Sequence, residues 1–555
     1  MIDKFKKIFF SYWFLALVFS IPTFSTLIRS GYFPMHDDIS AMRLLEMDKC
    51  VKDGQIPCRW VPDMGFGYGY PQFNFYAPAP YYLMEGFHLT GLGYLDSVKA
   101  GFIVSFILST LGMYLLGKSL WGSLGGFVSA VFYSYLPYRA MDAFARGAVG
   151  ELYALALIPF VFWACREALL GRKRAVLWLA LSLSALLGSH NITGMIFLPF
   201  FVGWAIFLVF SQKLSLLPDF KKRIFELGSG IVWGLGISSF FILPAFVERN
   251  LVHIKTLTGG YFDFLAHFVS FSQLFFSSYF GYGTSEAGPW DETLFTVGIF
   301  HWAIPVLAIV VAYALKKRKE IPNLLFWVVA GLVAAFLAHG RSVFLWKTLP
   351  FTSFIQFPWR LLILSGFFFS VGAGAIALFF PKGGRKLLYA LALCLIVILF
   401  YAGMFKPLKW LNITDAEKFS GEAWQRQQTV SIFDYLPITV KKGPTHEAPQ
   451  MPRVVSGDAE VSNWQKGTDW QKGEIVVKQK ATLEFPIYYF PNWEVIANGN
   501  KLNLDYQNDL GLISVSLEPG DYEITAGLRN TPVRTLGNII SLIGFILIPL
   551  YLRKK

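Results

Sequence analysis

The first residues able to do acid–base chemistry are His36, Asp37 and Asp38, which directly follow the first apolar run of the chain. A carboxylate at such a place can accept a proton as a general base, and two carboxylates together can hold a divalent metal ion. The simpler interpretation is that one aspartate caps a helix beginning at Ile39, since aspartate is among the best N-cap residues. One cap needs only one aspartate, so the residues alone leave the chemical and the structural interpretation equally open.

A second group of charges lies in PYRAMDAFARGAVGELYA, residues 137–154, where Arg146 precedes Glu151. These two could form a structural ion pair at the start of the next apolar run. Alternatively, Arg146 binds a lipid phosphate, for which the planar guanidinium fork is well suited. His190, in the stretch SHN, is interpreted either as a polar cap between two apolar runs or as part of the same site.

A third group is QFPWR, residues 356–360, placed just before another apolar run. Arg360 either extends its charged end to the membrane surface or clamps a phosphate. The stretch FGYGTSEAGPWDETLF adds the carboxylates of Glu286, Asp291 and Glu292, for which solvated turn residues are the alternative to a site.

The composition identifies the kind of protein that must position these residues. Of 555 residues, 54% are hydrophobic and only 15% are charged, against roughly 25% charged residues in soluble domains. The mean hydropathy is +0.48. A net charge of +13 would suggest nucleic acid in a soluble chain, but here the basic residues lie in short clusters between apolar runs. The chain is therefore predicted to be a multi-pass protein of the plasma membrane, in contact with membrane lipids and without a nucleic-acid partner.

Apolar runs long enough to cross a hydrocarbon core of about 30 Å recur along the chain. The twelve predicted spans are 8–29, 98–117, 121–138, 148–166, 175–190, 193–211, 226–246, 294–315, 322–339, 360–380, 387–406 and 535–552. The strong Lys/Arg clusters between spans, such as KKRKE, fall on one side if the N-terminus is cytoplasmic. By the positive-inside rule, both termini are then cytoplasmic. The first span lacks a small-residue cleavage site after it, which predicts a retained anchor.

This topology places three large pieces on the outer side, residues 30–97, 247–293 and 407–534. Residues 1–406 form the transmembrane module, with the first two pieces as its outer loops. In the third piece, alternating segments such as WEVIANGNKLNLDY between turn signals predict a β-sandwich. The expected fold class is therefore an all-α polytopic membrane module with an extracytoplasmic all-β domain, held by the final helix and basic tail of 535–555.

The first outer loop contains two more features. Apolar and charged residues follow helical spacing in ISAMRLLEMDKCVKDG, residues 39–54, which predicts an amphipathic helix on the membrane surface. Cys50 and Cys58 lie in the same loop, and the sequence leaves an extracytoplasmic disulfide and two free thiols equally open. A formal P-loop match, GMYLLGKS at residues 112–119, is rejected because its intervening residues are apolar and end a span.

Several stretches occur in an order that resembles a known family: HDD, RGAVGE, SHN, GYGTSEAGPWD, QFPWR, DYLP at 434–437 and FPNWEVIANGNKL. Together they resemble the YfhO-like membrane proteins and the set labelled "6-pyruvoyl-tetrahydropterin synthase-related". Both look like GT-C glycosyltransferases. The pterin label implies a soluble zinc enzyme, and we discount it because the chain shows no credible three-histidine zinc set.

The resemblance implies a GT-C fold and a glycosyltransferase that uses a sugar attached to polyprenyl phosphate. Its acceptor is expected to be an extracytoplasmic glycan, lipid or protein. Asp37 is implied as the general base for the acceptor hydroxyl, and Asp38 as a residue that orients the acceptor. Whether Mg²⁺ or Mn²⁺ binds at these two aspartates is left open, and no other cofactor is implied. Arg146 and Arg360, assisted by His190, are expected to stabilise the departing phosphate. The implied supporting residues are His36, Glu151, Tyr282, Asp291 and Trp359.

A non-enzymatic transporter or binder of lipid-linked glycans is the main alternative. A transporter is expected to carry polar or charged residues at the middle of several spans and to show paired repeat halves. Here the middles of the spans are nearly all apolar, and the charges gather at their outer ends. An adhesion protein that displays the β-domain would need neither the spans nor the HDD motif. The pattern therefore favours a transferase.

Overall fold

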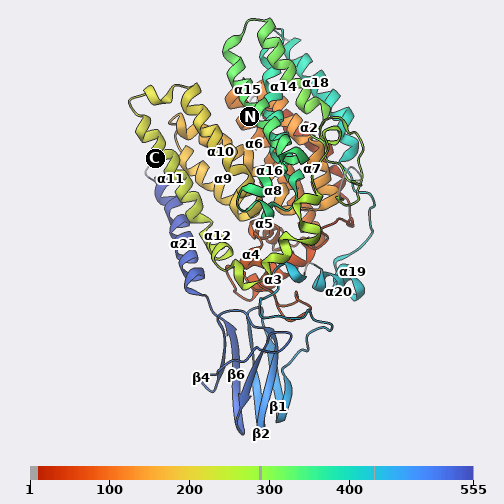
Figure 1. Ribbon diagram of the computed structural model, residues 1–555, viewed down its shortest axis with the longest axis vertical. Helices are drawn as coiled ribbons and strands as arrows, with labels where there is room; N and C mark the ends of the chain where they lie inside the picture. The colour runs from red at the N-terminus through yellow and green to blue at the C-terminus, as the bar shows by residue number, and fades with distance from the viewer. Residues whose placement is uncertain (1–10, 287–290, 382, 384, 431, 554–555) are drawn as a thin grey trace.

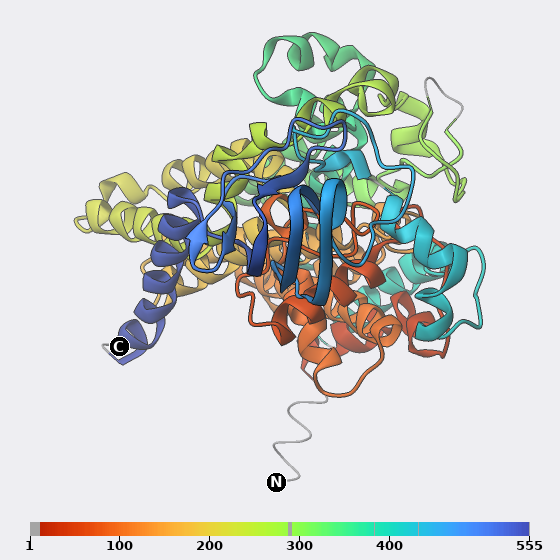
Figure 2. The same cartoon turned by 90° about the horizontal axis from the view of Figure 1, so that it is seen from below.

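The structure is a computed structural model that describes residues 11–286, 291–381, 383, 385–430 and 432–553. Helices form a large module, and the strands near the C-terminus form a sheet at one end of it (Figure 1). Seen from that end, the strands lie across the face of the helical module (Figure 2).

The helices follow the apolar runs, and each predicted span overlaps one of the longer helices. These are α2 Tyr12–Ser20, α6 Tyr94–Ser134, α8 Val149–Leu169, α9 Ala175–Ser189, α10 Asn191–Ser211, α11 Phe220–Ile237, α12 Ser239–Val247, α14 Ile299–Ala314, α15 Ile321–Ala338, α17 Leu362–Ala373, α18 Arg385–Tyr401 and α21 Pro532–Arg553. The shorter helices are α3 Ser40–Lys52, α4 Gln72–Phe75, α5 Ala79–His88, α7 Pro137–Met141, α13 Phe271–Phe276, α16 Val343–Thr348, α19 Asp415–Lys418 and α20 Gly421–Thr429.

Within the described residues, seven helices are long and apolar enough to cross a membrane, or up to eight if the pair α11 and α12, bent by 74°, forms one span. Three shorter apolar helices coincide with further predicted spans. The helix α6 runs through two predicted spans, 98–117 and 121–138, and Gly122 kinks it between them with a φ of 76°. The structure therefore shows a membrane module, while the number of twelve spans stays a prediction.

The helix α17 is enclosed, and all of its residues are buried. Small and large residues mix along LILSGFFFSVGA, so the small ones allow neighbouring helices to approach and the large ones fill the space between them. The helices α6, α8, α14 and α15 pack around it. A short 3₁₀ turn, η12 Pro358–Leu361, leads into α17. The QFPWR stretch therefore lies inside the module and not on its lipid-facing surface.

The strands form one antiparallel six-stranded sheet in the order β1-β2-β6-β3-β4, with β5 also paired to β2. They are β1 Arg453–Lys466, β2 Trp470–Tyr488, β3 Trp493–Ala497, β4 Asn500–Lys501, β5 Leu512–Leu517 and β6 Gly520–Leu528. The sequence predicted a sandwich, which needs two separate sheets. The strand β2 instead connects the strands into one sheet, because its first half pairs with β6 and its second half with β5.

The three predicted outer pieces meet one another between the module and the sheet. Tyr32 and Leu411 form an isolated antiparallel bridge that joins the first piece to the third. Val252 and Pro437 form another, which joins the second piece to the third. These contacts agree with the prediction that the three pieces share one side of the membrane, although the sidedness itself stays a prediction.

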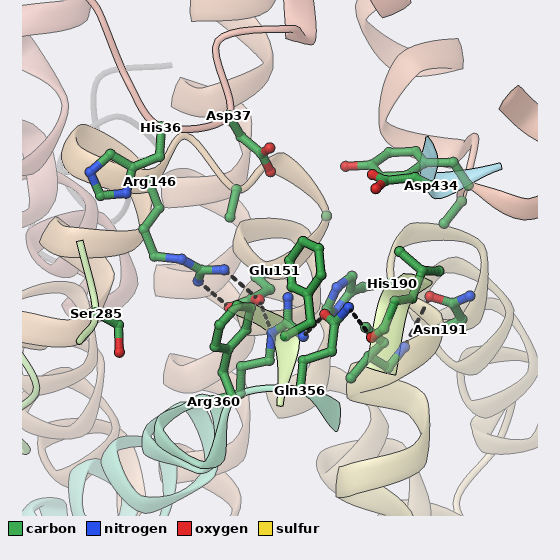
Figure 3. Close-up of a pocket in the computed structure, with 18 of the residues that line it drawn as sticks. His36, Asp37, Arg146, Glu151, His190, Asn191, Ser285, Gln356, Arg360 and Asp434 are labelled. Carbon is green, nitrogen blue, oxygen red and sulfur yellow. Dashed lines mark hydrogen bonds and ion pairs between the residues drawn. The ribbon is translucent and has the colours of Figure 1, made fainter. Parts of the chain in front are cut away.

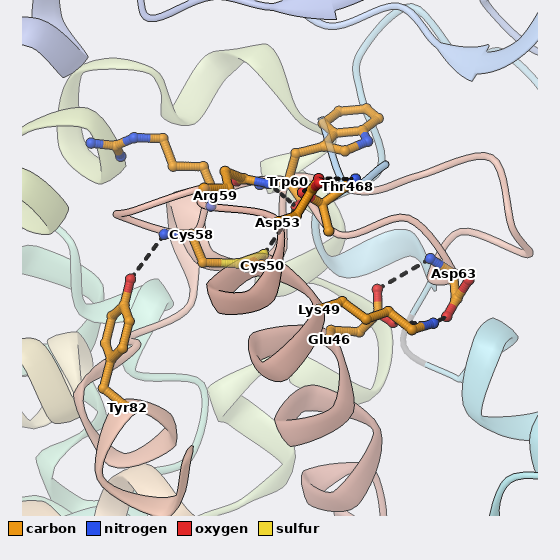
Figure 4. Close-up of a disulfide and its surroundings, with 11 residues drawn as sticks. Glu46, Lys49, Cys50, Asp53, Cys58, Arg59, Trp60, Asp63, Tyr82 and Thr468 are labelled. Atoms are coloured by element: carbon orange, nitrogen blue, oxygen red, sulfur yellow. Dashed lines mark hydrogen bonds and ion pairs between the residues drawn. A yellow bond between two sulfur atoms is a disulfide. The ribbon is translucent and has the colours of Figure 1, made fainter. Parts of the chain in front are cut away.

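The helix α3 is buried, whereas the sequence predicted a helix on the membrane surface. Nine of its residues are buried, because α5 and α6 pack against it and the sheet domain contacts its C-terminal end. Asp53, just past that end, accepts hydrogen bonds from the backbone N and the Oγ1 of Thr468, both at 2.7 Å. A disulfide joins Cys50 to Cys58 across the same loop (Figure 4).

Candidate functional site

A cavity of about 270 Å³ lies where the predicted outer loops meet the ends of the module helices (Figure 3). This volume is close to the lower end of the usual range for small-molecule sites, about 300 Å³. The residues that line it are His36, Asp37, Arg43, Tyr76, Ala77, Arg146, Ala148, Gly150, Glu151, Ser189, His190, Asn191, Ile192, Leu257, Tyr261, Phe262, Ser285, Thr293, Phe295, Gln356, Phe357, Trp359, Arg360, Asp434 and Tyr435. The structure thus brings together the HDD, RGAVGE, SHN and QFPWR stretches, which are far apart in sequence.

The turn that carries His36 and Asp37 is anchored by its backbone to the segment before α8. His36 N donates to the carbonyl of Ala145 at 2.9 Å, and Asp37 N donates to the carbonyl of Arg146 at 2.8 Å. The side chain of Asp37 lines the cavity. In the part of the chain that the structure describes, its carboxylate has no hydrogen bond or ion pair. Asp37 is therefore available to a ligand.

Asp38 has a different environment, since it does not line the cavity. Its Oδ1 forms an ion pair with Lys418 Nζ at 2.8 Å. Burial raises the pKa of Asp38, and the charge of Lys418 opposes that rise. Neither aspartate caps α3, because the N-cap position is Ile39 and no side-chain cap bond is present there. The helix-cap interpretation is therefore wrong, and the two carboxylates have separate surroundings.

Glu151 joins the two arginines that the sequence singled out as phosphate ligands. Arg146 donates to it through both terminal nitrogens, at 2.6 Å to Oε2 and 2.9 Å to Oε1. Arg360 Nε donates to Oε1 at 2.7 Å, and the Tyr138 hydroxyl donates to Oε2 at 3.0 Å. Glu151 is 1% exposed and Arg360 is 8% exposed. These donors compensate a buried carboxylate for the water that it has lost.

Asp142 also pairs with Arg146. Burial, and next the negative charge of Glu151, raise the pKa of Asp142 well above its ordinary value. The guanidinium groups of Arg146 and Arg360 converge on Glu151 at the cavity wall. Such a wall favours an anionic ligand.

Aromatic rings hold this cluster in place. The guanidinium of Arg146 lies 4.6 Å from the ring centroid of Trp359, a geometry that attracts a cation to the ring face. Trp359 stacks on Phe357 with 4.7 Å between centroids, and its Nε1 donates to Ser285 Oγ at 3.1 Å. The tryptophan is therefore fixed on two sides, and it restricts the orientation of Arg146.

His190 occupies the N-cap position of α10. Its Nδ1 accepts a hydrogen bond from Thr193 N at 3.3 Å and lies 2.6 Å from Thr193 Oγ1. Because Nδ1 accepts, the ring proton belongs on Nε2, which can donate to a group bound in the cavity.

The remaining predicted residues divide into two sets. His36, Glu151 and Trp359 line the cavity, whereas Tyr282 and Asp291 do not. The carbonyl of Tyr282 accepts from His36 Nε2 at 2.8 Å, so Tyr282 positions a lining residue. Asp291 accepts from Gln273 Nε2 at 2.8 Å and holds the neighbouring loop.

Sequence reasoning did not assign Arg43, Gln356, Asp434 or Tyr435 to the site, although all four line the cavity. Asp434 belongs to the DYLP stretch, which contributed only to the resemblance. In Figure 3, Asp434 and Asp37 both lie above the cluster of Arg146, Glu151 and Arg360. Arg43 lies on α3 between Met42 and Leu44 in sequence, and helical spacing alone gives no signal that it is buried.

The described carboxylates of the site do not form a preformed metal centre of three protein ligands. Among the residues that the structure describes, no group of three His, Cys, Asp or Glu side chains could hold a metal ion. Asp38 is engaged by Lys418, so Asp37 and Asp38 do not act as a ligand pair. Because Mg²⁺ is usually held by one or two carboxylates together with substrate phosphates and water, a metal ion at Asp37 stays a prediction.

Comparison with known proteins finds no matching protein family. An uncharacterized protein of Lactococcus lactis subsp. cremoris (strain MG1363) is 22% identical over 321 residues, which cover 56% of this chain and 49% of that protein. The match therefore spans about half the length of that relative.

Solved structures with similar features include a mutant of arabinofuranosyltransferase AftD from Mycobacteria, with a TM-score of 0.45 and 14% identity over 72% of this chain and 28% of that chain. The archaeal oligosaccharyltransferase AglB from Archaeoglobus fulgidus, in complex with an inhibitory peptide and a dolichol-phosphate, has a TM-score of 0.41 and 12% identity, covering 79% and 60%. ArnT from Cupriavidus metallidurans, bound to undecaprenyl phosphate, has a TM-score of 0.40 and 13% identity, covering 70% and 63%. At these TM-scores we base no conclusion on the similarities.

Proposed function

We propose that the protein transfers a sugar from a polyprenyl-phosphate-linked donor to an extracytoplasmic glycan, lipid or protein. The observation that carries this proposal is the Asp37 carboxylate, which has no ion pair among the described residues and lines the same cavity as the Arg146–Glu151–Arg360 cluster. Such a transfer requires a base for the acceptor and a positive wall for the departing phosphate. The apolar helices beside the cavity suit a donor that is anchored in the membrane.

In the proposed reaction, Asp37 takes the proton of the acceptor hydroxyl while the hydroxyl oxygen attacks the anomeric carbon of the donor sugar. A bond forms between that oxygen and the anomeric carbon. The bond from the anomeric carbon to the phosphate oxygen breaks, and its electron pair goes to the phosphate. Arg146 and Arg360 stabilise the charge that develops on the phosphate, and His190 donates a hydrogen bond through Nε2.

Glu151 and Asp38 have supporting roles in this proposal. Glu151 keeps the two guanidinium groups oriented, since it accepts from both of them. Asp38 fixes the turn of Asp37 through its ion pair with Lys418. A preorganised set of charges does not have to rearrange during the reaction, which is the main advantage of such a site.

Purified protein, incubated with labelled polyprenyl-phosphate sugars and candidate acceptors, tests the proposal. Asp37→Asn removes the base with little change of shape and is expected to slow transfer by about 10²- to 10⁴-fold. Asp38→Asn, which weakens the ion pair with Lys418 outside the cavity, is the comparison variant and is expected to slow transfer much less than Asp37→Asn does. Equal rates for the wild type and Asp37→Asn would show that Asp37 is not the base.

The alternative function is the transport or binding of lipid-linked glycans without chemistry. In that case the wild type gives no transfer with any donor, yet it binds labelled lipid-linked glycan or moves it across a vesicle membrane. The same purified protein, reconstituted in vesicles, distinguishes the two functions.

A further inference from the structure

Arg43 differs from Arg146 and Arg360 in having no carboxylate partner. It is 4% exposed and lines the cavity together with Asp37. Its guanidinium lies over the ring of Tyr76, 3.9 Å from the ring centroid. Within the described residues, the side chain makes no ion pair, its hydrogen-bonding neighbour is the neutral side chain of Tyr81, and its Nε is buried without a partner.

An enclosed guanidinium in this state is unfavourable. Burial removes water from a charge, and an ion pair with hydrogen bonds is needed to replace it. Glu151 fulfils this need for Arg146 and Arg360. Tyr76 offers Arg43 only the weaker attraction of a ring face and Tyr81 only a neutral hydroxyl, so in the described structure the positive charge of the guanidinium is not paired with a carboxylate.

Asp37 does not take the place of the missing partner. Its negative charge acts on Arg43, but no hydrogen bond or ion pair joins the two in the described structure. A carboxylate that serves as a base must also remain available to the acceptor. The Arg43 guanidinium and the Asp37 carboxylate therefore line the same cavity as two separate groups. Arg43 can bind an anion through its unpartnered Nε, and Asp37 can accept a proton.

We propose, building on the proposed function, that Arg43 binds an anionic group of the substrate, a phosphate or a carboxylate, beside Asp37. The guanidinium fork matches either group with two parallel hydrogen bonds. Asp37 is the proposed base for the acceptor, and Arg43 lines the cavity beside it. This position of Arg43 favours the acceptor as the substrate that carries the anionic group. The substrate class is then an acidic glycan or a phosphate-bearing acceptor, and the phosphate of the donor is the other source.

Binding to the full-length protein in nanodiscs tests this assignment without requiring turnover. One arm compares decaprenyl phosphate with decaprenol, and the other compares methyl glucuronide and glycerol phosphate with methyl glucoside and glycerol. The measured quantity is the affinity ratio of the anionic to the neutral probe. Arg43→Gln is expected to lower this ratio by about 10-fold or more in one arm. Arg43→Lys keeps the charge without the fork and is expected to give an intermediate ratio.

Arg29→Gln is the matched control, because Arg29 also lies over an aromatic ring, that of Trp410, but is exposed and does not line the cavity. A loss confined to the soluble probes assigns Arg43 to the acceptor, and a loss confined to the lipid assigns it to the donor phosphate. An unchanged ratio in both arms for Arg43→Gln, or no anionic preference in the wild type, overturns the proposal. If the wild type prefers the anionic probes and Arg43→Gln lowers that preference, but no sugar is transferred, the result contradicts the proposed function and not the role of Arg43.

Discussion

Glu46 gives this protein a pH-dependent stability that a single substitution can remove. The residue lies on α3 and is 0% exposed. Its Oε2 accepts from the backbone N of Asp63 at 3.1 Å, and Lys49 Nζ lies 3.6 Å from Oε1 (Figure 4). Burial outweighs the nearby lysine charges and raises the pKa of Glu46 from 4.5 to about 7.

The sign and size of the effect follow from this shift. The folded protein keeps a proton on Glu46 that the unfolded chain releases between pH 4.5 and about 7. The stabilising contribution is therefore fully present below pH 4.5, decreases as the pH rises and is lost above about pH 7. The difference between the pKa of Glu46 in the folded protein and in the unfolded chain corresponds to about 3 kcal/mol in the free energy of unfolding. Glu46→Gln has no proton to release, so its stability lacks this dependence.

The assay is the apparent Tm of the purified protein at a fixed scan rate, at pH 5 and at pH 8. Between pH 5 and pH 8, the Tm of the wild type is expected to fall further than the Tm of Glu46→Gln. The variant is expected to be the more stable of the two at pH 8. Glu422→Gln, which removes an exposed carboxylate, is the control for a change of net charge. A parallel pH dependence of the wild type and Glu46→Gln would refute the reasoning, because the buried carboxylate would then not hold the proton.

The other predictions concern the cavity and the loop that supports it. Glu151→Gln leaves two buried guanidinium groups without their ionised partner and is expected to cost about 3–5 kcal/mol, measured as a lower Tm together with a loss of sugar transfer. His190 lines the cavity with Nδ1 engaged by Thr193, so His190→Gln, which replaces the ring N–H donor, is expected to lower the rate of sugar transfer more than it lowers the Tm. Replacing Cys50 and Cys58 by serine removes the disulfide of a short loop and is expected to cost about 2 kcal/mol, seen as faster limited proteolysis of that loop.

Much of the membrane module could be predicted because its signal is local. A continuous apolar run predicts a helix whose surface packs against other helices or contacts lipid, and this prediction does not depend on which helices are its neighbours. The polar residues at the ends of these runs were found for the same reason, since Arg146, Glu151 and Arg360 stand out against an apolar background. Their convergence on one cavity could only be expected from the resemblance.

The rest depends on contacts that the local sequence does not encode. Asp37 and Asp38 are adjacent, yet one lines the cavity and the other pairs with Lys418. Arg43 was assigned to a surface helix because the spacing of α3 does not reveal that α5 and α6 pack against it. Asp434 reaches the cavity through the fold of a segment far from the apolar runs. Each of these outcomes is set by tertiary packing and not by helix periodicity.

The sheet domain is attached to the membrane module at both of its ends, through the segment after α18 and through α21. The second attachment is firm, since Arg534 Nε donates to Glu248 Oε2 at 2.9 Å and Phe240 N donates to Ser541 Oγ at 2.7 Å. A domain on one linker can swing freely, whereas a domain with two attachments can only rock about the line between them. A single proteolytic cut before β1 would therefore leave the sheet attached to the membrane module through α21.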